Sequence, residues 1–198
     1  MSVTSSALAP DPAVLASLKD YAQDKFDALF FNKPTPLMWI CYAFLRVATL
    51  GGQKDFMTKF TTTLGRRVYF SQGLENLYKM YRVLAHEMVH MLQALRMGLI
   101  PFVSKYATRE GRAELEFEAY QMSNAVAIWR GATQEDLERS VEKQVPHFTT
   151  STYLWMCTDE KAVRDRLWAD IQEVRSGMYA MRSTLAHDVR LIVLNGTL

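Results

Sequence analysis

The sequence of 198 residues contains little cysteine, little histidine and no long run of charges of one sign. Its two cysteines, Cys41 and Cys157, lie in apolar surroundings and are too few for a disulfide framework, so we expect buried free thiols in a reducing compartment. Acidic and basic residues nearly balance, with a net charge of +2, and are spread along the chain. We therefore expect no nucleic-acid partner, because no strong positive field would attract a phosphate backbone.

Long hydrophobic runs are also missing. The most apolar segment, residues 37–50, is interrupted by Arg46 and is shorter than the roughly 20 residues of a membrane-spanning helix. The first residues lack the basic and apolar regions of a secretory signal peptide. These absences predict a chain without a membrane span, located in the cytoplasm, exported by a dedicated machine, or carried in a particle such as a virion.

The composition is that of a globular protein. Hydrophobic residues make up 49% of the chain and charged residues 22%, which argues against disorder and against a fibrous protein. A length of 198 residues suits one ordinary domain with its own core. We therefore expect a single domain over residues 1–198.

Helical spacing of apolar residues predicts that most of the chain is helical. Asp11 and Pro12 fit an N-cap and a first helical position, and apolar residues then recur at helical spacing up to Phe30. Further helices are expected over residues 37–50, 74–97, 109–130, 134–145 and 159–176. The last residues, 190–198, fit either a short strand or the end of a helix.

One segment has the composition of a β-strand. Residues 61–70 are rich in threonine, aromatic and β-branched side chains, and Gly65 in the middle marks a turn or a bulge. This segment comes shortly before the helix that is expected to end at Gly98, and a turn through Gly98 and Pro101 is expected to follow that helix.

That helix carries two histidines four residues apart, in the sequence His86-Glu87-Met88-Val89-His90. Its apolar residues form a core stripe on one side, namely Leu77, Leu84, Met88, Met91 and Leu95. A second group clusters on the opposite side, namely His86, His90, Gln93 and Met97. Both imidazoles can reach one metal ion from there, and Glu87 can take a proton from a water that the metal activates. This is the HExxH pattern of zinc peptidases.

A third ligand is needed to distinguish a metal site from two histidines on an ordinary helix, because three fixed letters also arise by chance. The other histidines, His147 and His187, are far downstream, so a carboxylate is the better candidate. The candidates are Glu114, Glu116 and Glu118, which alternate along one helix and point in different directions.

With these residues the sequence resembles the gluzincin clan of metallopeptidases, whose ligands are HExxH and a glutamate on a later helix. The segment "EFEAY", residues 116–120, is similar to the ExxAD motif, and this resemblance implies Glu116 as the third ligand. Tyr120 stands where the clan has aspartate, so another group must orient a ligand histidine, for example Glu114, Glu118 or a backbone carbonyl. Alignment on the EAxxD form of the motif selects Glu118 instead.

The resemblance covers residues 61–122 and includes the strand before the motif. It implies an α+β, mostly helical, zincin-like fold with a small sheet beside the HExxH helix. In compact gluzincin-like peptidases an edge strand at this place holds an extended substrate by backbone hydrogen bonds.

The resemblance also implies a function, hydrolysis of a polypeptide substrate with Zn²⁺ as cofactor. The implied metal ligands are His86, His90 and Glu116. Glu87 would be the general base. An oxyanion also needs a donor, and the family analogy gives Tyr153 and His147, in the loop after Pro146. Arg112, one turn before Glu116, could instead pair with that ligand.

Two other interpretations are compatible with the sequence. The chain could be a non-catalytic zinc-binding structural or interaction subunit of a larger assembly, with a protein partner, for example in a virion. Tyr120 in place of aspartate favours this interpretation, whereas the intact Glu87 opposes it. The other is a helical protein that holds no metal.

Overall fold

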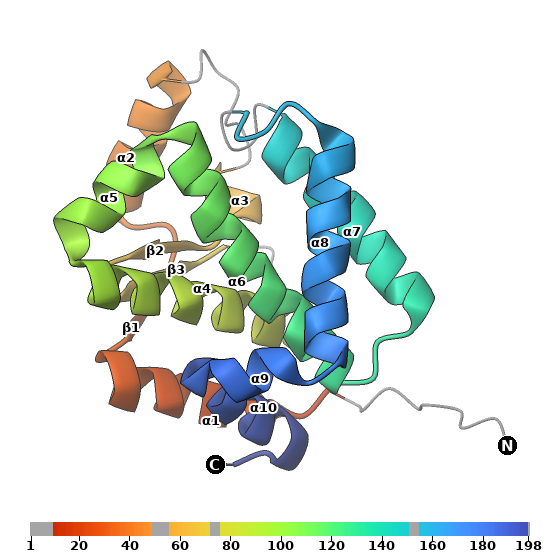
Figure 1. Cartoon of the computed structure of the whole chain (residues 1–198). Helices are drawn as coiled ribbons and strands as arrows, with labels where there is room; N and C mark the ends of the chain where they lie inside the picture. The colour runs from red at the N-terminus through yellow and green to blue at the C-terminus, as the bar shows by residue number, and fades with distance from the viewer. Residues whose placement is uncertain (1–9, 49–55, 72–75, 151–154, 198) are drawn as a thin grey trace, which may run out of the picture.

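The structure, a computed structural model, describes residues 10–48, 56–71, 76–150 and 155–197, and most of these are helical (Figure 1). The helices are α1 (Pro12–Phe26), α2 (Pro36–Ala48), α3 (Phe56–Lys59), α4 (Leu77–Met97), α5 (Leu99–Ala107), α6 (Arg109–Trp129), α7 (Gln134–Thr149), α8 (Glu160–Arg175), α9 (Met178–Arg182) and α10 (Thr184–Asn195). The strands are β1 (Leu29–Asn32), β2 (Thr62–Leu64) and β3 (Arg67–Phe70). The prediction of a mostly helical α+β fold is confirmed.

The sheet has three strands in the order β1-β3-β2. The predicted strand over residues 61–70 is a hairpin, in which β2 and β3 pair antiparallel and Gly65 takes a left-handed φ of +59° in the turn. β2 lies at the edge of the sheet and contacts α4. The sheet therefore lies beside the helix with the two histidines, as predicted.

The first helix is shorter than predicted. The helical spacing of apolar residues predicts a helix up to Phe30, but α1 stops four residues earlier. It ends at Phe26, where Asp27 takes a left-handed conformation with φ of +51°. The following residues form β1, which pairs parallel with β3, and Phe30 stacks on Phe70 with ring centroids 5.8 Å apart. Pairing with a distant strand thus overrides the local helical spacing.

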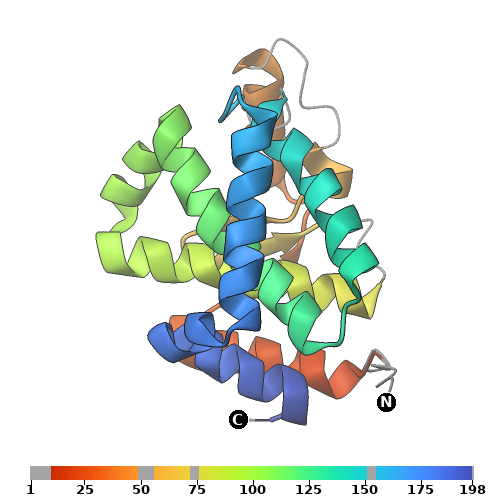
Figure 2. The same cartoon turned by 45° about the vertical axis from the view of Figure 1, so that its right-hand side comes forward.

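Helices α4 and α6 form the centre of the fold (Figure 1). α4 packs against α1, α6 and β2, and α6 packs against α4, α7, α8 and α10. In Figure 2, α7 and α8 cover one side of α6, while α1, α9 and α10 lie together below. Because both long helices are enclosed by other elements, side chains between α4 and α6 are shielded from water.

The core side of α4 agrees with the prediction along most of its length. Leu84, Met88 and Met91 are buried, and Leu77 packs partly buried against the same cluster. Leu95, which was predicted to lie in the core, is instead 69% exposed, so the core stripe ends before the last turn of α4. The helix ends at Gly98, which has a φ of +81°.

Two prolines were given the wrong role. Pro101 was expected to keep the chain in a turn, but it lies in the first turn of α5, where its missing N–H would have no helical partner. Pro146 was expected to end its helix, but α7 continues to Thr149. It lies in the last turn, so only one hydrogen bond of the helix is lost. Residues 184–195 form α10, so the described part of the C-terminal segment is the end of a helix and not a strand.

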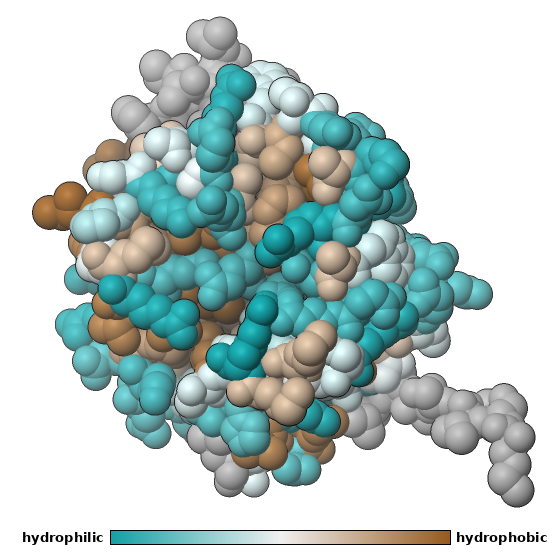
Figure 3. Space-filling view, viewed as in Figure 1, coloured by the Kyte–Doolittle hydropathy of each residue, from teal (hydrophilic) through white to brown (hydrophobic). Residues whose placement is uncertain are grey.

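The surface near α5 carries exposed hydrophobic side chains, at one edge of the face shown in Figure 3. Hydrophilic side chains cover most of α6 and α8 on this face, and hydrophobic ones gather at the edge where α5 lies. Leu99, Ile100 and Val103 of α5 are all more than half exposed. Among the described residues, no helix combines the length and the apolar composition that a membrane crossing requires.

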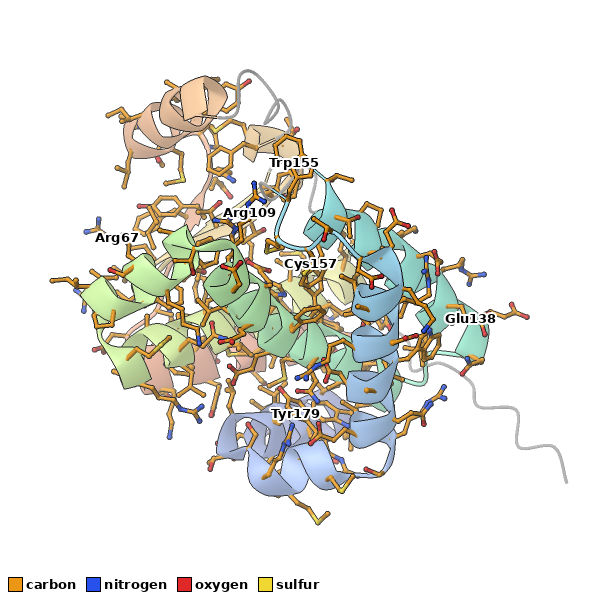
Figure 4. All side chains as sticks on the ribbon, turned by 45° about the horizontal axis from the view of Figure 1, so that its top comes forward. Arg67, Arg109, Glu138, Trp155, Cys157 and Tyr179 are labelled. Carbon is orange, nitrogen blue, oxygen red and sulfur yellow. The ribbon has the colours of Figure 1, made fainter. Side chains whose placement is uncertain are left out.

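Cys157 lies in the segment that leads into α8, and Figure 4 labels it together with Trp155. Its thiol is free, as predicted, but the residue is half-buried rather than buried, and this partial burial raises the pKa of the thiol. The thiol is therefore less reactive than an exposed one. Cys41 belongs to α2, but its side chain lies outside the described residues.

A buried carboxyl on α8 predicts a dependence of stability on pH. Burial raises the pKa of Asp170 to about 6. Its partner Arg166 lowers this pKa only in part, because the guanidinium is largely exposed. Glu173 raises the pKa and Arg182 lowers it. Below about pH 4 the carboxyl is neutral in both the folded and the unfolded chain. Between about pH 4 and pH 6 only the unfolded chain ionises, so stability falls with rising pH until the folded carboxyl also ionises near 6. We expect Asp170→Asn to raise the free energy of unfolding at pH 8 by about 1 to 2 kcal/mol, and not at pH 4. Urea denaturation at both pH values would measure this, and an equal effect at both would contradict it.

Candidate metal centre

One group of side chains in the described part of the chain has the composition and closeness of a metal site. It consists of His86 and His90 from α4 and Glu116 from α6. The two histidines are one turn apart on α4, and the packing of α6 against α4 brings the carboxylate to them. α5 joins the two helices, and its Phe102 and Tyr106 rings contact His90 edge to face.

The distances within this group fit a small tetrahedral cation. The Nε2 atoms of His86 and His90 are 3.2 Å apart. Oε2 of Glu116 is 3.4 Å from His86 Nε2, and Oε1 is 3.5 Å from His90 Nε2. Tetrahedral zinc with bonds of about 2.0 to 2.2 Å holds its ligand atoms roughly 3.3 to 3.5 Å apart. Three ligands of this kind with a fourth position open for water are typical of a catalytic zinc site.

The carboxylate of Glu116 is incompletely satisfied by the protein. Glu116 is 1% exposed, and Oε1 accepts a hydrogen bond of 2.6 Å from the hydroxyl of Tyr106 on α5. Oε2 is buried and has no hydrogen-bond donor among the described residues. A buried carboxylate oxygen without a hydrogen-bond partner is rare, because it costs up to several kcal/mol. A bound cation would supply the missing partner.

The electrostatics of the group agree with its geometry. Burial would raise the pKa of Glu116, but His90 and His86 outweigh it and hold this pKa well below the usual range. Burial would lower the pKa of His90, but the Glu116 carboxylate outweighs it and raises this pKa to about 9. A proton and a metal ion therefore compete for the same ring nitrogen.

Each histidine is held by a neighbour that the family motif does not include. Nδ1 of His90 lies 2.9 Å from Oε1 of Gln93, one turn further along α4. The ring of His86 packs edge to face against Tyr120, with centroids 4.9 Å apart. Tyr120, at the position of the family's aspartate, thus supports a ligand histidine by packing.

Glu87 lies near His90 and has no hydrogen-bond partner for its carboxylate among the described residues. The residue is 6% exposed. It is close enough to raise the pKa of both His90 and Tyr106. Such a carboxylate is available to accept a proton beside the centre.

Of the two predicted oxyanion donors, the structure describes His147 but not Tyr153. His147 was placed in a loop, but it lies in the last turn of α7, and the Tyr120 hydroxyl hydrogen-bonds to its Nδ1. Burial lowers the pKa of His147, and its ring meets Phe60 edge to face. His147 is therefore joined to the centre through Tyr120. Tyr153 lies outside the described residues.

The other acidic and basic candidates on α6 face elsewhere. Glu118 accepts a hydrogen bond of 2.9 Å from Gln93 and lies 3.9 Å from Arg96. Glu114 pairs with Lys105, and Arg112 donates to the backbone carbonyl of Tyr106 rather than to Glu116. The structure thus brings Glu116, not Glu118, to the two histidines.

Sequence reasoning missed two residues that contact the ligands. Gln93 was placed on the same side of the helix as the histidines, which was a usable signal, but it was given no role. Tyr106 lies on α5, a helix that was not predicted, and nothing in its local sequence indicates that it contacts Glu116.

Comparisons of the chain with family models, with characterised proteins and with solved structures found no significant match. The interpretation of this centre therefore depends on its own geometry. The resemblance of its motifs to those of the gluzincins stays a prediction.

Proposed function

We propose that the chain is a zinc-dependent peptidase with a zincin-like fold, related in its ligand set to the gluzincins. The observation that supports this most is the buried group of two imidazoles and one carboxylate at tetrahedral spacing, with the unpartnered carboxylate of Glu87 beside it. A purely structural zinc site would need the ligands but would have no use for Glu87. This residue is what favours a catalytic centre over a structural one.

The ligand atoms would be Nε2 of His86 and His90 and Oε2 of Glu116, the oxygen without a donor. Zinc bound there would activate a water and polarise the carbonyl of the scissile peptide bond. Tyr106 keeps the other oxygen of Glu116 engaged, so that Glu116 offers one oxygen to the ion.

Glu87 would carry the proton during hydrolysis. Its carboxylate takes a proton from the attacking water as the new C–O bond forms, and it later gives this proton to the nitrogen of the leaving amine as the C–N bond breaks. Burial of Glu87 keeps bulk water from competing for this transfer. His147, whose Nδ1 is hydrogen-bonded to Tyr120, would donate to the carbonyl oxygen.

The edge of the sheet offers a place for the substrate. Among the described strands, β2 pairs with β3 alone, and β2 also contacts the motif helix. An extended peptide can add to such an edge by backbone hydrogen bonds, which do not require a particular sequence. Its peptide bonds would then lie along α4.

The experiment is to incubate the zinc-loaded chain with a mixture of unrelated peptides and to identify new termini by mass spectrometry. We expect cleavage that stops when zinc is removed by a chelator and returns when zinc is added back. A chain that holds zinc and leaves every peptide intact would contradict the proposal and would favour a structural role.

A further inference from the structure

We propose that Gln93 is the positioning residue of the metal centre, a role that rests on the proposed function and that the ExxAD motif assigns to an aspartate. Gln93 lies one turn after His90 on α4 and is 3% exposed. Its Oε1 is 2.9 Å from Nδ1 of His90, whose other ring nitrogen faces Glu116. Gln93 thus lies directly behind a metal ligand.

The direction of this hydrogen bond follows from the other partners of the same amide. Nε2 of Gln93 donates to the backbone carbonyl of Leu115, at 3.1 Å, and to Oε2 of Glu118, at 2.9 Å. Both partners are acceptors only. The reversed amide would place its oxygen against two other oxygens, so this orientation is fixed by α6.

The fixed amide in turn fixes the tautomer of His90. Oε1 of Gln93 can only accept, so Nδ1 of His90 must carry the hydrogen, and the lone pair of the neutral ring is on Nε2. This nitrogen is 3.2 Å from His86 Nε2 and 3.5 Å from Glu116. When the metal displaces the proton on Nε2, the ring is therefore left in the tautomer that a ligand needs.

Glu118 acquires a function in this arrangement, although it is not a ligand. Its side chain is 45% exposed, and it anchors the amide that anchors the ligand. The chain from Glu118 through Gln93 to His90 connects α6 to α4. In a carboxylate–histidine–zinc triad the carboxylate orients the ligand histidine directly, whereas Glu118 orients His90 through the amide of Gln93.

Zinc affinity tests this role. Gln93→Leu removes both the acceptor for His90 and the donors to α6, and we expect it to weaken zinc binding about 10- to 100-fold, the usual effect of losing an outer partner of a ligand. Competition with a chromophoric chelator measures the affinity. Gln144→Leu is the matched control, because this buried glutamine of α7 pairs with Asn124 and shares no hydrogen bond with the metal ligands.

A pair of exchanges keeps the test informative if Gln93→Leu does not fold. Gln93→Glu alone places two carboxylates 2.9 Å apart and should weaken zinc binding. Glu118→Gln added to it restores a donor between the two side chains, while the carboxylate at position 93 keeps accepting from Nδ1 of His90. We expect the double variant to bind zinc more tightly than Gln93→Glu alone.

The hydrogen on His90 gives a second readout that does not depend on hydrolysis. In the zinc-loaded chain, NMR should show a ring N–H at Nδ1 of His90 that exchanges slowly with water, and fast exchange in Gln93→Leu. Wild-type affinity and slow exchange in Gln93→Leu would overturn the role of Gln93 while leaving the peptidase proposal intact. A chain that binds zinc and hydrolyses nothing would overturn only the peptidase, and a chain that binds no zinc would overturn both.

Discussion

Glu87→Gln is expected to bind zinc as tightly as the wild-type chain and to lose peptide hydrolysis by about 10²- to 10⁴-fold, the range that a general base contributes. The amide has nearly the same shape as the carboxylate, and Glu87 makes no hydrogen bond with the described residues that the change would break. The amide, however, cannot accept a proton from water. The measurement is the rate of cleavage of a peptide found to be a substrate, at equal zinc occupancy.

Two controls make this result specific. Zinc content must be the same in both proteins, which separates loss of the base from loss of the metal. Glu110→Gln, an exposed change in the first turn of α6, should leave the rate unchanged. If Glu87→Gln hydrolysed the peptide at the wild-type rate, Glu87 would not be the base, and the proposed chemistry would be wrong.

Glu116→Ala is expected to lose zinc far more severely than Glu118→Ala. The first change removes a ligand whose Oε2 is 3.4 Å from His86 and has no other described partner. The second removes only the anchor of Gln93, and we expect it to weaken zinc binding by no more than about tenfold, the lower end of the range for outer partners. Titration of the metal-free proteins with zinc in the presence of a competing chelator measures both.

The comparison also decides between the two alignments of the family motif. Equal retention of zinc in both variants would exclude both glutamates as ligands. A greater loss in Glu118→Ala would support the EAxxD alignment and contradict the geometry of the structure. Circular dichroism of each variant shows whether the loss of metal comes with a loss of fold.

The parts of the fold that follow from local pattern were predicted well. The helix with the motif has a clear apolar stripe and ends at a glycine, and residues 61–70 have strand composition with Gly65 at the turn. β1 was missed because its aromatic residues also fit helical spacing, and its pairing partner β3 is distant in sequence. The sequence does not predict α5, because Pro101 indicates a turn there, although the first turn of a helix tolerates proline.

The candidate site shows the same division. The relation of His86, Glu87 and His90 is local, since four residues make one turn of a helix, and it was predicted from spacing alone. The choice of Glu116 came from the resemblance, and the structure brings that residue to the histidines. The contacts of Gln93 and Tyr106 depend on how α4, α5 and α6 pack together, which no local pattern specifies.

The measurement that tests the central claim most directly is the metal content of the purified chain by elemental analysis, beside the His90→Ala variant. We expect about one zinc per wild-type chain, as three protein ligands in one site would hold, and almost none in the variant. A wild-type chain that stays free of metal after zinc is supplied, or a His90→Ala variant that keeps its zinc, would contradict the metal centre.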